Sequence, residues 1–96
     1  MKVPTIGHME YAVLNAMPRG LAVPGHFIRN YMDANGIRFS GPKFYQLMGR
    51  LERRKLVIGH YRSRIIYKHG RRRERWYRIT REGFTAMDIA FQFYTK

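Results

Sequence analysis

The stretch SGPKFYQLMGRLERRKLV, residues 40–57, decides the fold. Its apolar side chains have the i, i+3, i+4 and i+7 spacing of one buried helix face, namely Phe44, Leu47, Met48 and Leu51. Ser40 is a good N-cap, and Pro42 suits the first helical turn. The other side of the helix carries cations and a glutamine. The sequence therefore predicts an amphipathic helix over about 41–55 whose cationic face points outward.

A second short helix is expected immediately upstream. Pro24 fits its first turn, and Gly36 suits the left-handed position that ends a helix. Between them, one predicted face is apolar and consists of Phe27, Ile28, Tyr31 and Met32. Two short helices joined by a turn, the second with outward cations, are typical of a helix-turn-helix.

The N-terminal part predicts one more helix, over 5–18, followed by a short β-type run at 21–23. Apolar residues recur with helical spacing at Ile6, Met9, Val13 and Met17. Thr5 is the expected cap, and the Pro18 to Gly20 segment is the expected end.

Beyond residue 55 the composition changes to that of strands. LVIGHYRSRIIYKH (56–69) and WYRIT (76–80) are rich in β-branched and aromatic residues. HGRRRE (69–74) lies between them, and Gly70 tolerates the positive φ of a hairpin turn. We expect two antiparallel strands, with the turn centred on His69, Gly70 or one of the arginines.

The expected order of elements is helix, short strand, helix, helix, strand, strand, helix, in one domain over 1–96. This is an α+β fold, a winged helix-turn-helix with a C-terminal helix added at 81–95, for which Thr80 is the expected cap.

Charge is concentrated in one third of the chain. The formal net charge is +13, and residues 49–81 hold thirteen basic and two acidic groups, a net of +11. The stretch KHGRRRERW (68–76) alone holds one Lys and four Arg. Since a chain with one strongly basic face is suited to a polyphosphate partner, nucleic acid is favoured over a membrane or an acidic protein.

Other classes of site are disfavoured. The chain has no cysteine, and its histidines, at positions 8, 26, 60 and 69, have no i, i+4 pair, so we expect no metal and no cofactor. No Ser/His/Asp grouping, glycine-rich phosphate loop or carboxylate pair is recognisable, which indicates a non-enzyme. No signal peptide or membrane-length apolar run is visible, and the lack of cysteine fits a reducing cytoplasm, where the nucleoid is the expected location.

The candidate DNA contacts lie on the predicted helix 41–55 and on the basic wing, 60–79. Base reading is expected near the start of the helix, from Lys43, Tyr45 and Gln46. Ser40 is a cap that can also touch a phosphate. Phosphate or minor-groove contacts are expected from Arg50, Arg53, Arg54, Arg64, Lys68, Arg71, Arg72, Arg73 and Arg75. Alternatively the helix arginines are solvated surface charge, Tyr45 is half-buried, and the wing arginines form an ordinary loop; Trp76 is expected to pack in the hairpin.

The C-terminal helix has too much apolar surface for a small monomer to cover. Its polar residues form one narrow stripe, Thr85, Asp88, Gln92 and Thr95. The predicted dimer contacts are Phe84, Met87, Phe91 and Tyr94, which alternatively belong to the core of one chain; a second apolar face (Ala86, Ile89, Ala90, Phe93) favours a homodimer.

Three segments resemble the PadR-type transcriptional regulators. EYAVLNAM (10–17) resembles their opening helix, and residues 40–57 resemble their recognition helix and the strand that follows it. WYRITREG (76–83) resembles their second wing strand and the start of the next helix. The MarR and ArsR types share parts of these motifs. The resemblance implies a winged helix that binds duplex DNA in transcriptional regulation, in a bacterial or phage setting, and says nothing of an effector. Departures are PGHFI (24–28) in place of a frequent Gly-Tyr-Glu, a longer and more basic wing, and a brief C-terminal part.

Two other functions fit the same charge pattern. One is an RNA-binding or ribosome-associated winged-helix protein, and the other is a protein–protein adaptor whose basic wing meets an acidic partner. The first predicts tighter binding to structured RNA than to duplex DNA, and the second predicts weak DNA binding at physiological salt.

Overall fold

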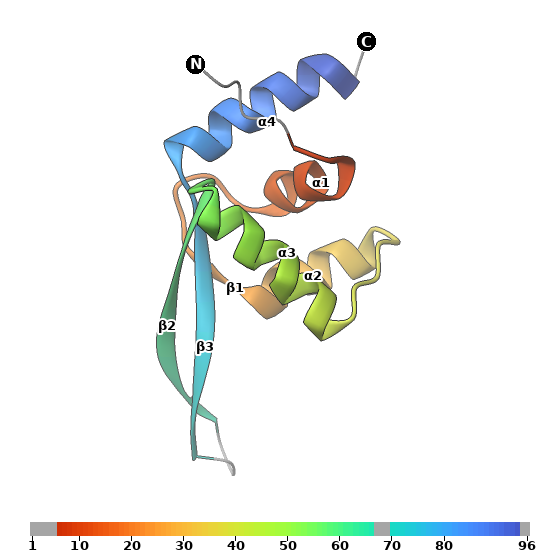
Figure 1. The fold of residues 1–96 in the computed structure, drawn as a ribbon. Helices are drawn as coiled ribbons and strands as arrows, with labels where there is room; N and C mark the ends of the chain where they lie inside the picture. The colour runs from red at the N-terminus through yellow and green to blue at the C-terminus, as the bar shows by residue number, and fades with distance from the viewer. Residues whose placement is uncertain (1–5, 67–69, 95–96) are drawn as a thin grey trace.

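The computed structural model describes residues 6–66 and 70–94, with the backbone alone at 64–66 and 70–72. The elements are α1 (His8–Ala16), β1 (Val23–Pro24), α2 (Gly25–Ala34), α3 (Gly41–Arg53), β2 (Val57–Ile66), β3 (Gly70–Ile79) and α4 (Arg81–Tyr94). This is the order expected from the sequence, and the fold is an α+β winged helix. Figure 1 shows the helices gathered at one end and the β2–β3 hairpin projecting from them at the other.

The sheet has three antiparallel strands in the order β1-β3-β2. The register of the hairpin, left open by the sequence, pairs Val57 with Ile79 at the base and Ile66 with Gly70 toward the tip. The connection therefore falls at 67–69, outside the described residues, and Gly70 begins β3. Of the turn centres that the sequence left open, Gly70 and the arginines are excluded, because residues 70–74 are paired along the ladder.

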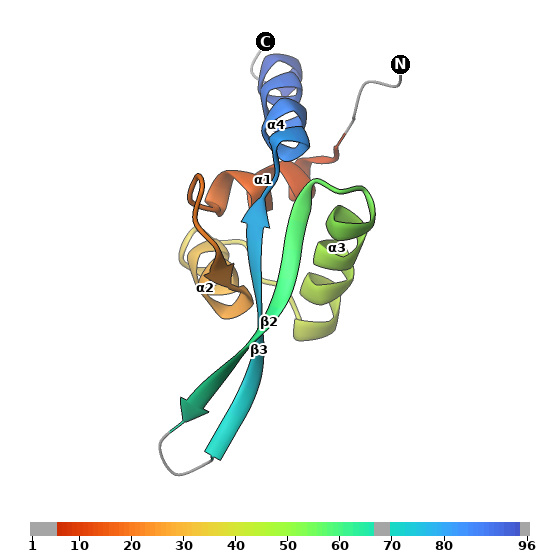
Figure 2. The same ribbon diagram turned by 90° about the vertical axis from the view of Figure 1, so that its left-hand side faces the viewer.

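The hairpin makes the molecule long and narrow, with principal extents of 50 × 29 × 22 Å. Figure 2 shows β2 and β3 running past α2 and α3 and continuing beyond them. The basic stretch from Gly70 to Arg75 thus forms one arm of an extended wing.

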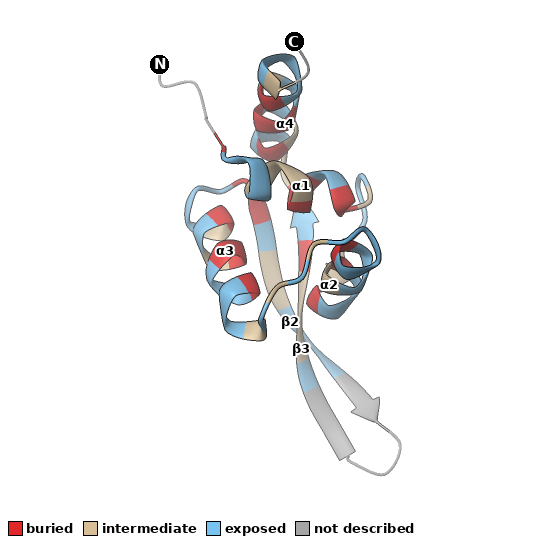
Figure 3. Cartoon of the chain, turned by 90° about the vertical axis from the view of Figure 1, so that its right-hand side faces the viewer, coloured by how far each residue is buried: buried red, intermediate tan, exposed pale blue. Residues whose placement is uncertain are grey.

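The core lies where the four helices meet the base of the sheet, as the distribution of buried residues in Figure 3 shows. The predicted buried face of α3 is confirmed, since its four residues are 0–3% exposed: Phe44, Leu47, Met48 and Leu51. In α2 only half of the predicted apolar face is inside. Ile28 and Met32 are buried, whereas Phe27 is 46% exposed and Tyr31 is 49% exposed.

The helix ends explain the boundaries. Ser40 caps α3 by accepting a hydrogen bond from the Lys43 N–H at 3.3 Å, and Gly36 has the expected positive φ of 84° after α2. α1 begins later than predicted, at His8 with Gly7 as N-cap, and the Gly7 N–H donates to Glu10 Oε1 at 3.0 Å. Thr5 lies outside the described residues. Pro24 is the N-cap of α2 instead of a first-turn residue.

Thr80 joins the sheet to α4. Its hydroxyl accepts from the Gly83 N–H at 3.0 Å, as predicted for a cap, and donates to the Lys55 carbonyl at 2.7 Å. Gly83 packs directly on the Leu56 carbonyl, and a Cβ at this position would overlap with that oxygen. The absence of a side chain therefore lets α4 approach the end of α3.

Candidate nucleic-acid interface

The outward face of α3 carries the side chains expected to read bases. Lys43 and Gln46, in the first two turns, are exposed, and so are Arg50 and Arg53 further along. None of these three cations has an ion-pair partner among the described residues. The burial of the opposite face in the core therefore fixes the direction in which these polar side chains point.

Tyr45 is half-exposed and braced against α2. The residue is 44% exposed, and its ring meets that of Phe44 edge-on, with centroids 5.0 Å apart. Its hydroxyl lies so near Gly25 that a Cβ there would be 3.0 Å from the oxygen. Tyr45 is therefore half-buried, as one alternative expected, and its exposed edge is also open to a base contact, as the other expected.

The wing is joined to α3 by an ion pair. The Arg75 guanidinium donates from Nε to Glu52 Oε2 at 3.2 Å and from a terminal nitrogen to Glu52 Oε1. The hydrogen bond to the carboxylate is the main reason that the pKa of Arg75 is raised, with desolvation acting in the opposite direction. Arg75, expected to contact DNA, is thus held within the protein in this structure.

Two arginines stack on one tyrosine of the wing. The guanidinium carbons of Arg73 and Arg75 lie 4.6 and 4.7 Å from the ring centroid of Tyr61. These distances are within cation–π range. Arg73 and Tyr61 are exposed, so the stack presents a cation at the surface close to α3.

A hollow of about 570 Å³ separates α3 from the wing. It is lined by Tyr45, Glu52, Tyr61, Arg73, Glu74, Arg75 and Tyr77. Tyr77 is 1% exposed, and burial raises the pKa of its hydroxyl well above the ordinary value, with Glu52 adding to the effect. The phenol therefore stays neutral at physiological pH, and the charges of the hollow come from its carboxylates and guanidiniums.

Trp76 packs in the hairpin, as expected. It pairs in register with His60, and the guanidinium of Arg62 lies 4.2 Å from its ring centroid. Arg62 also donates from Nε to His60 Nε2 at 3.0 Å. Arg62 was not among the predicted contacts; the signal was its position two residues after His60 in a strand, which places both side chains on one face.

The remaining cations of the predicted wing site are Arg64, Lys68, Arg71 and Arg72. Lys68 lies outside the described residues. Arg64, Arg71 and Arg72 lie on the two strands, where only their backbone is described. The register sets Arg64 opposite Arg72.

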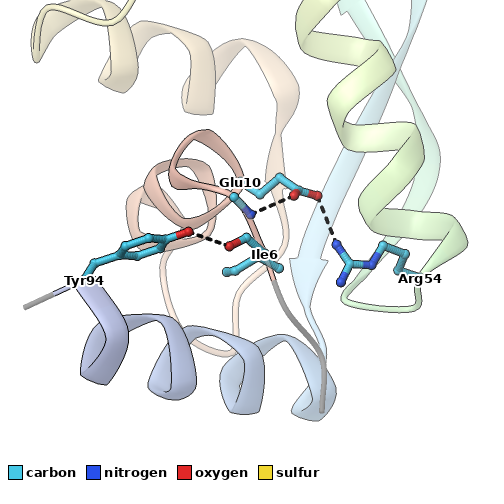
Figure 4. Close-up of polar contacts among 5 residues, drawn as sticks. Ile6, Glu10, Arg54 and Tyr94 are labelled. Atoms are coloured by element: carbon cyan, nitrogen blue, oxygen red, sulfur yellow. Dashed lines mark hydrogen bonds and ion pairs between the residues drawn. The ribbon is translucent and has the colours of Figure 1, made fainter. Parts of the chain in front are cut away.

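Arg54 lies apart from the other α3 cations. It follows the last turn of the helix and donates to Glu10 Oε2 of α1 at 3.3 Å, as Figure 4 shows. Glu10 also accepts from the Gly7 N–H, so the carboxylate links the start of α1 to the end of α3. This contact accounts for Arg54 within the fold and directs it toward α1, whereas a DNA contact was expected.

The four residues expected at a dimer interface differ in exposure. Met87 is 8% exposed and belongs to the core, and Phe84 packs against it. Tyr94 is partly buried, and its hydroxyl donates to the Ile6 carbonyl at 2.8 Å (Figure 4). Phe91 is 56% exposed, and Phe93, from the second apolar face, is 76% exposed. The core explains the first three residues, and the open aromatic surface is at Phe91 and Phe93.

Within residues 6–66 and 70–94, no group of three or more His, Asp or Glu residues is arranged to hold a metal ion. In the same part of the chain, no helix combines the length and apolar composition that crossing a bilayer requires.

The arrangement of helices and wing is similar to that of known regulators. A PadR family transcription regulator from Clostridium difficile matches with a TM-score of 0.74 and 18% identity, over 93% of this chain and 88% of that one. A PadR family regulator from Eggerthella lenta matches with a TM-score of 0.70 and 22% identity, over 91% and 72%. This chain has the PadR-type winged-helix fold.

One of the structurally similar proteins was solved with nucleic acid bound. Bacillus subtilis PadR, in complex with operator DNA, matches with a TM-score of 0.67 and 16% identity, over 88% of this chain and 46% of that one. The sequence itself matches no protein-family model and no curated protein. The similarity therefore lies in the fold.

Proposed function

We propose that this protein is a homodimeric, sequence-specific binder of duplex DNA that acts as a transcriptional regulator and not as an enzyme. The observation that carries the proposal is that α3, with exposed Lys43, Arg50 and Arg53, and the basic strand β3, with exposed Arg73, flank one hollow. The PadR-type fold supports it, since one protein of that fold is in complex with operator DNA. The cytoplasm, at the nucleoid, is the location that such a partner implies.

In this proposal α3 enters the major groove and the wing follows the backbone or the adjacent minor groove. Lys43, Tyr45 and Gln46 lie where a recognition helix reaches base edges. Arg50, Arg53 and Arg73 are exposed and suited to phosphates.

The strands of the wing carry further cations. Arg64 of β2 pairs in register with Arg72 of β3, and Arg71 precedes Arg72 in the ladder. These arginines and Lys68 belong to the segment 49–81, with its net charge of +11, and we include all four among the proposed phosphate contacts.

The proposed dimer forms through α4. Phe91 and Phe93 present exposed aromatic surface, which typically marks an interface. Pairing of two protomers would set the half-sites about one helical turn, roughly 34 Å, apart.

A competition titration tests the proposal. The protein is bound to a labelled duplex at two salt concentrations and challenged with unlabelled duplex DNA or with structured RNA. We expect duplex DNA to compete better and affinity to fall steeply as salt rises. Better competition by structured RNA would replace the proposal with an RNA-binding function, and weak binding of both at physiological salt would favour the adaptor.

A further inference from the structure

Successive residues of β3 connect the wing to two different helices. Glu74 Oε1 lies 2.8 Å from His26 Nδ1 in the first turn of α2, and Arg75 binds Glu52 of α3. The contacts join β3 to α2 and α3, the helices beside which the hairpin leaves the helical body in Figures 1 and 2. They are therefore placed to set the angle of the wing relative to the helix-turn-helix.

A glycine in β2 leaves the space that the contact between Glu52 and Arg75 requires. The pair lies over Gly59, where an added Cβ would overlap with the Glu52 carboxylate, 2.7 Å from its Cδ, and would lie 2.9 Å from Arg75 Nε. A side chain at Gly59 would occupy the space that the pair fills. The bare backbone of β2 thus lets a residue of β3 reach across to α3.

We propose that Glu52 and Arg75 form a clamp that positions the wing against the recognition helix, and that Arg75 contacts no phosphate. Its guanidinium makes two hydrogen bonds to one carboxylate, and the two side chains are only 27% and 21% exposed. A planar, bidentate pair of this kind fixes geometry better than a single contact. The inference rests on the proposed function for what the wing does, but not for the clamp itself.

The clamp also has a consequence for Arg73. Arg75 stacks on Tyr61, and Arg73 stacks on the same ring. A guanidinium fixed by Glu52 keeps that ring in place, and the ring in turn directs Arg73. Glu52 is an acidic residue within the proposed DNA interface. Its role there is to position Arg73, a proposed phosphate contact.

Removing the negative charge of Glu52 tests the clamp, because electrostatics alone and loss of the clamp predict opposite changes in DNA affinity. Glu52→Gln makes the protein more positive by one charge, so electrostatics alone predicts tighter DNA binding. Loss of the clamp predicts weaker binding, by about three- to tenfold, since the wing samples other angles. Gly59→Ala displaces the pair with no change of charge and should weaken binding similarly.

Arg75→Gln is compared with Arg78→Gln, because Arg78 is an exposed arginine of the same strand. Both variants lose one positive charge. We expect Arg75→Gln to bind DNA more weakly than Arg78→Gln and with the same salt dependence, since neither loses a phosphate contact. A slope lower by about 0.9 for Arg75→Gln alone would identify a phosphate contact and overturn the inference.

A measurement without DNA separates the clamp from the proposed function. The chain has no cysteine, so spin labels can be placed at Ser63→Cys in the wing and Asn15→Cys in α1, both exposed positions. Pulsed electron resonance should give one narrow distance distribution in the otherwise wild-type protein and a broad one with Glu52→Gln or Gly59→Ala.

The exchanged pair Glu52→Arg with Arg75→Glu should narrow the distribution again. Circular dichroism confirms that each variant is folded. An unchanged distribution in folded Glu52→Gln, or tighter DNA binding by it, overturns the clamp. Failure of the wild type to bind duplex DNA would overturn the proposed function and leave the distance test of the clamp intact.

Discussion

The two ends of this molecule have opposite surfaces. The wing and the C-terminal part of α3 belong to the segment 49–81, with a net charge of +11, whereas residues 82–96 have a net charge of −1. On α4 the exposed side chains include Phe91 and Phe93, at 56% and 76%. One end repels a second copy of itself and attracts phosphates, while the other offers apolar area to a second copy. In the proposed function, the polyanion and the second protomer therefore bind at different ends of one small domain.

The largest expected effect is at the apolar end. Phe91→Glu places a charge in the proposed interface and should convert a dimer to a monomer, because a buried unpaired carboxylate is costly. Affinity for a two-half-site duplex should fall about 100-fold or more, since the second contact is no longer intramolecular. Sedimentation measures the first effect and a titration the second. Gln92→Glu is the control with the same added charge, and a monomeric wild type would contradict the dimer.

At the basic end, replacing Arg71, Arg72 and Arg73 together by Ala should reduce the salt dependence of binding. The slope of log affinity against log salt should fall by about two to three, at about 0.9 per phosphate contact. The mass in sedimentation should not change. Arg81→Ala, at the start of α4, serves as the control for a single exposed arginine outside the wing. An unchanged slope in the triple variant would remove the wing from the interface.

A smaller and different effect is expected on α3. Gln46→Ala should cost about 1–3 kcal/mol of discrimination at one base position and leave the salt slope unchanged. The comparison is between a preferred duplex and single-base variants of it. Equal losses on every duplex would mean that Gln46 does not read bases.

The smallest expected effects concern the two capping hydroxyls, one at each end of the fold. Ser40→Ala removes one bond at 3.3 Å and Thr80→Ala removes two, at 3.0 and 2.7 Å. Losing a cap lowers the free energy of unfolding by about 1 kcal/mol, and we expect the larger loss for Thr80. Urea denaturation measures both. A larger loss for Ser40 would contradict the role of Thr80 in joining α4 to the sheet.

The order of elements and the core of α3 could be predicted because each depends on local spacing. The i, i+3, i+4, i+7 pattern of α3 and the caps Ser40 and Thr80 correspond directly to what the structure shows. The hairpin register could not be predicted, since the strand pattern near Arg71 to Arg73 has no alternation of apolar and polar residues to define it. The end of α3 at Arg53 could not be predicted either, because the left-handed position after it, with φ of 61°, is taken by Lys55 and not by the usual glycine.

The candidate site was predicted as a set of cations, and the structure divides that set. Composition shows how many arginines lie in the wing but not which are already paired. Arg54 and Arg75 are bound to Glu10 and Glu52, which are 44 and 23 residues away in sequence. Glu52, Gly59 and Tyr61 were missed because their roles arise only when β2 passes between α3 and β3.

The central claim is that two copies of this chain read a duplex sequence with α3 and the wing. Selection of bound sequences from a random duplex library tests it most directly. The account predicts an enriched site with two related half-sites whose centres are about 10 base pairs apart. No enrichment above the starting library, with binding that ignores sequence, would contradict the account.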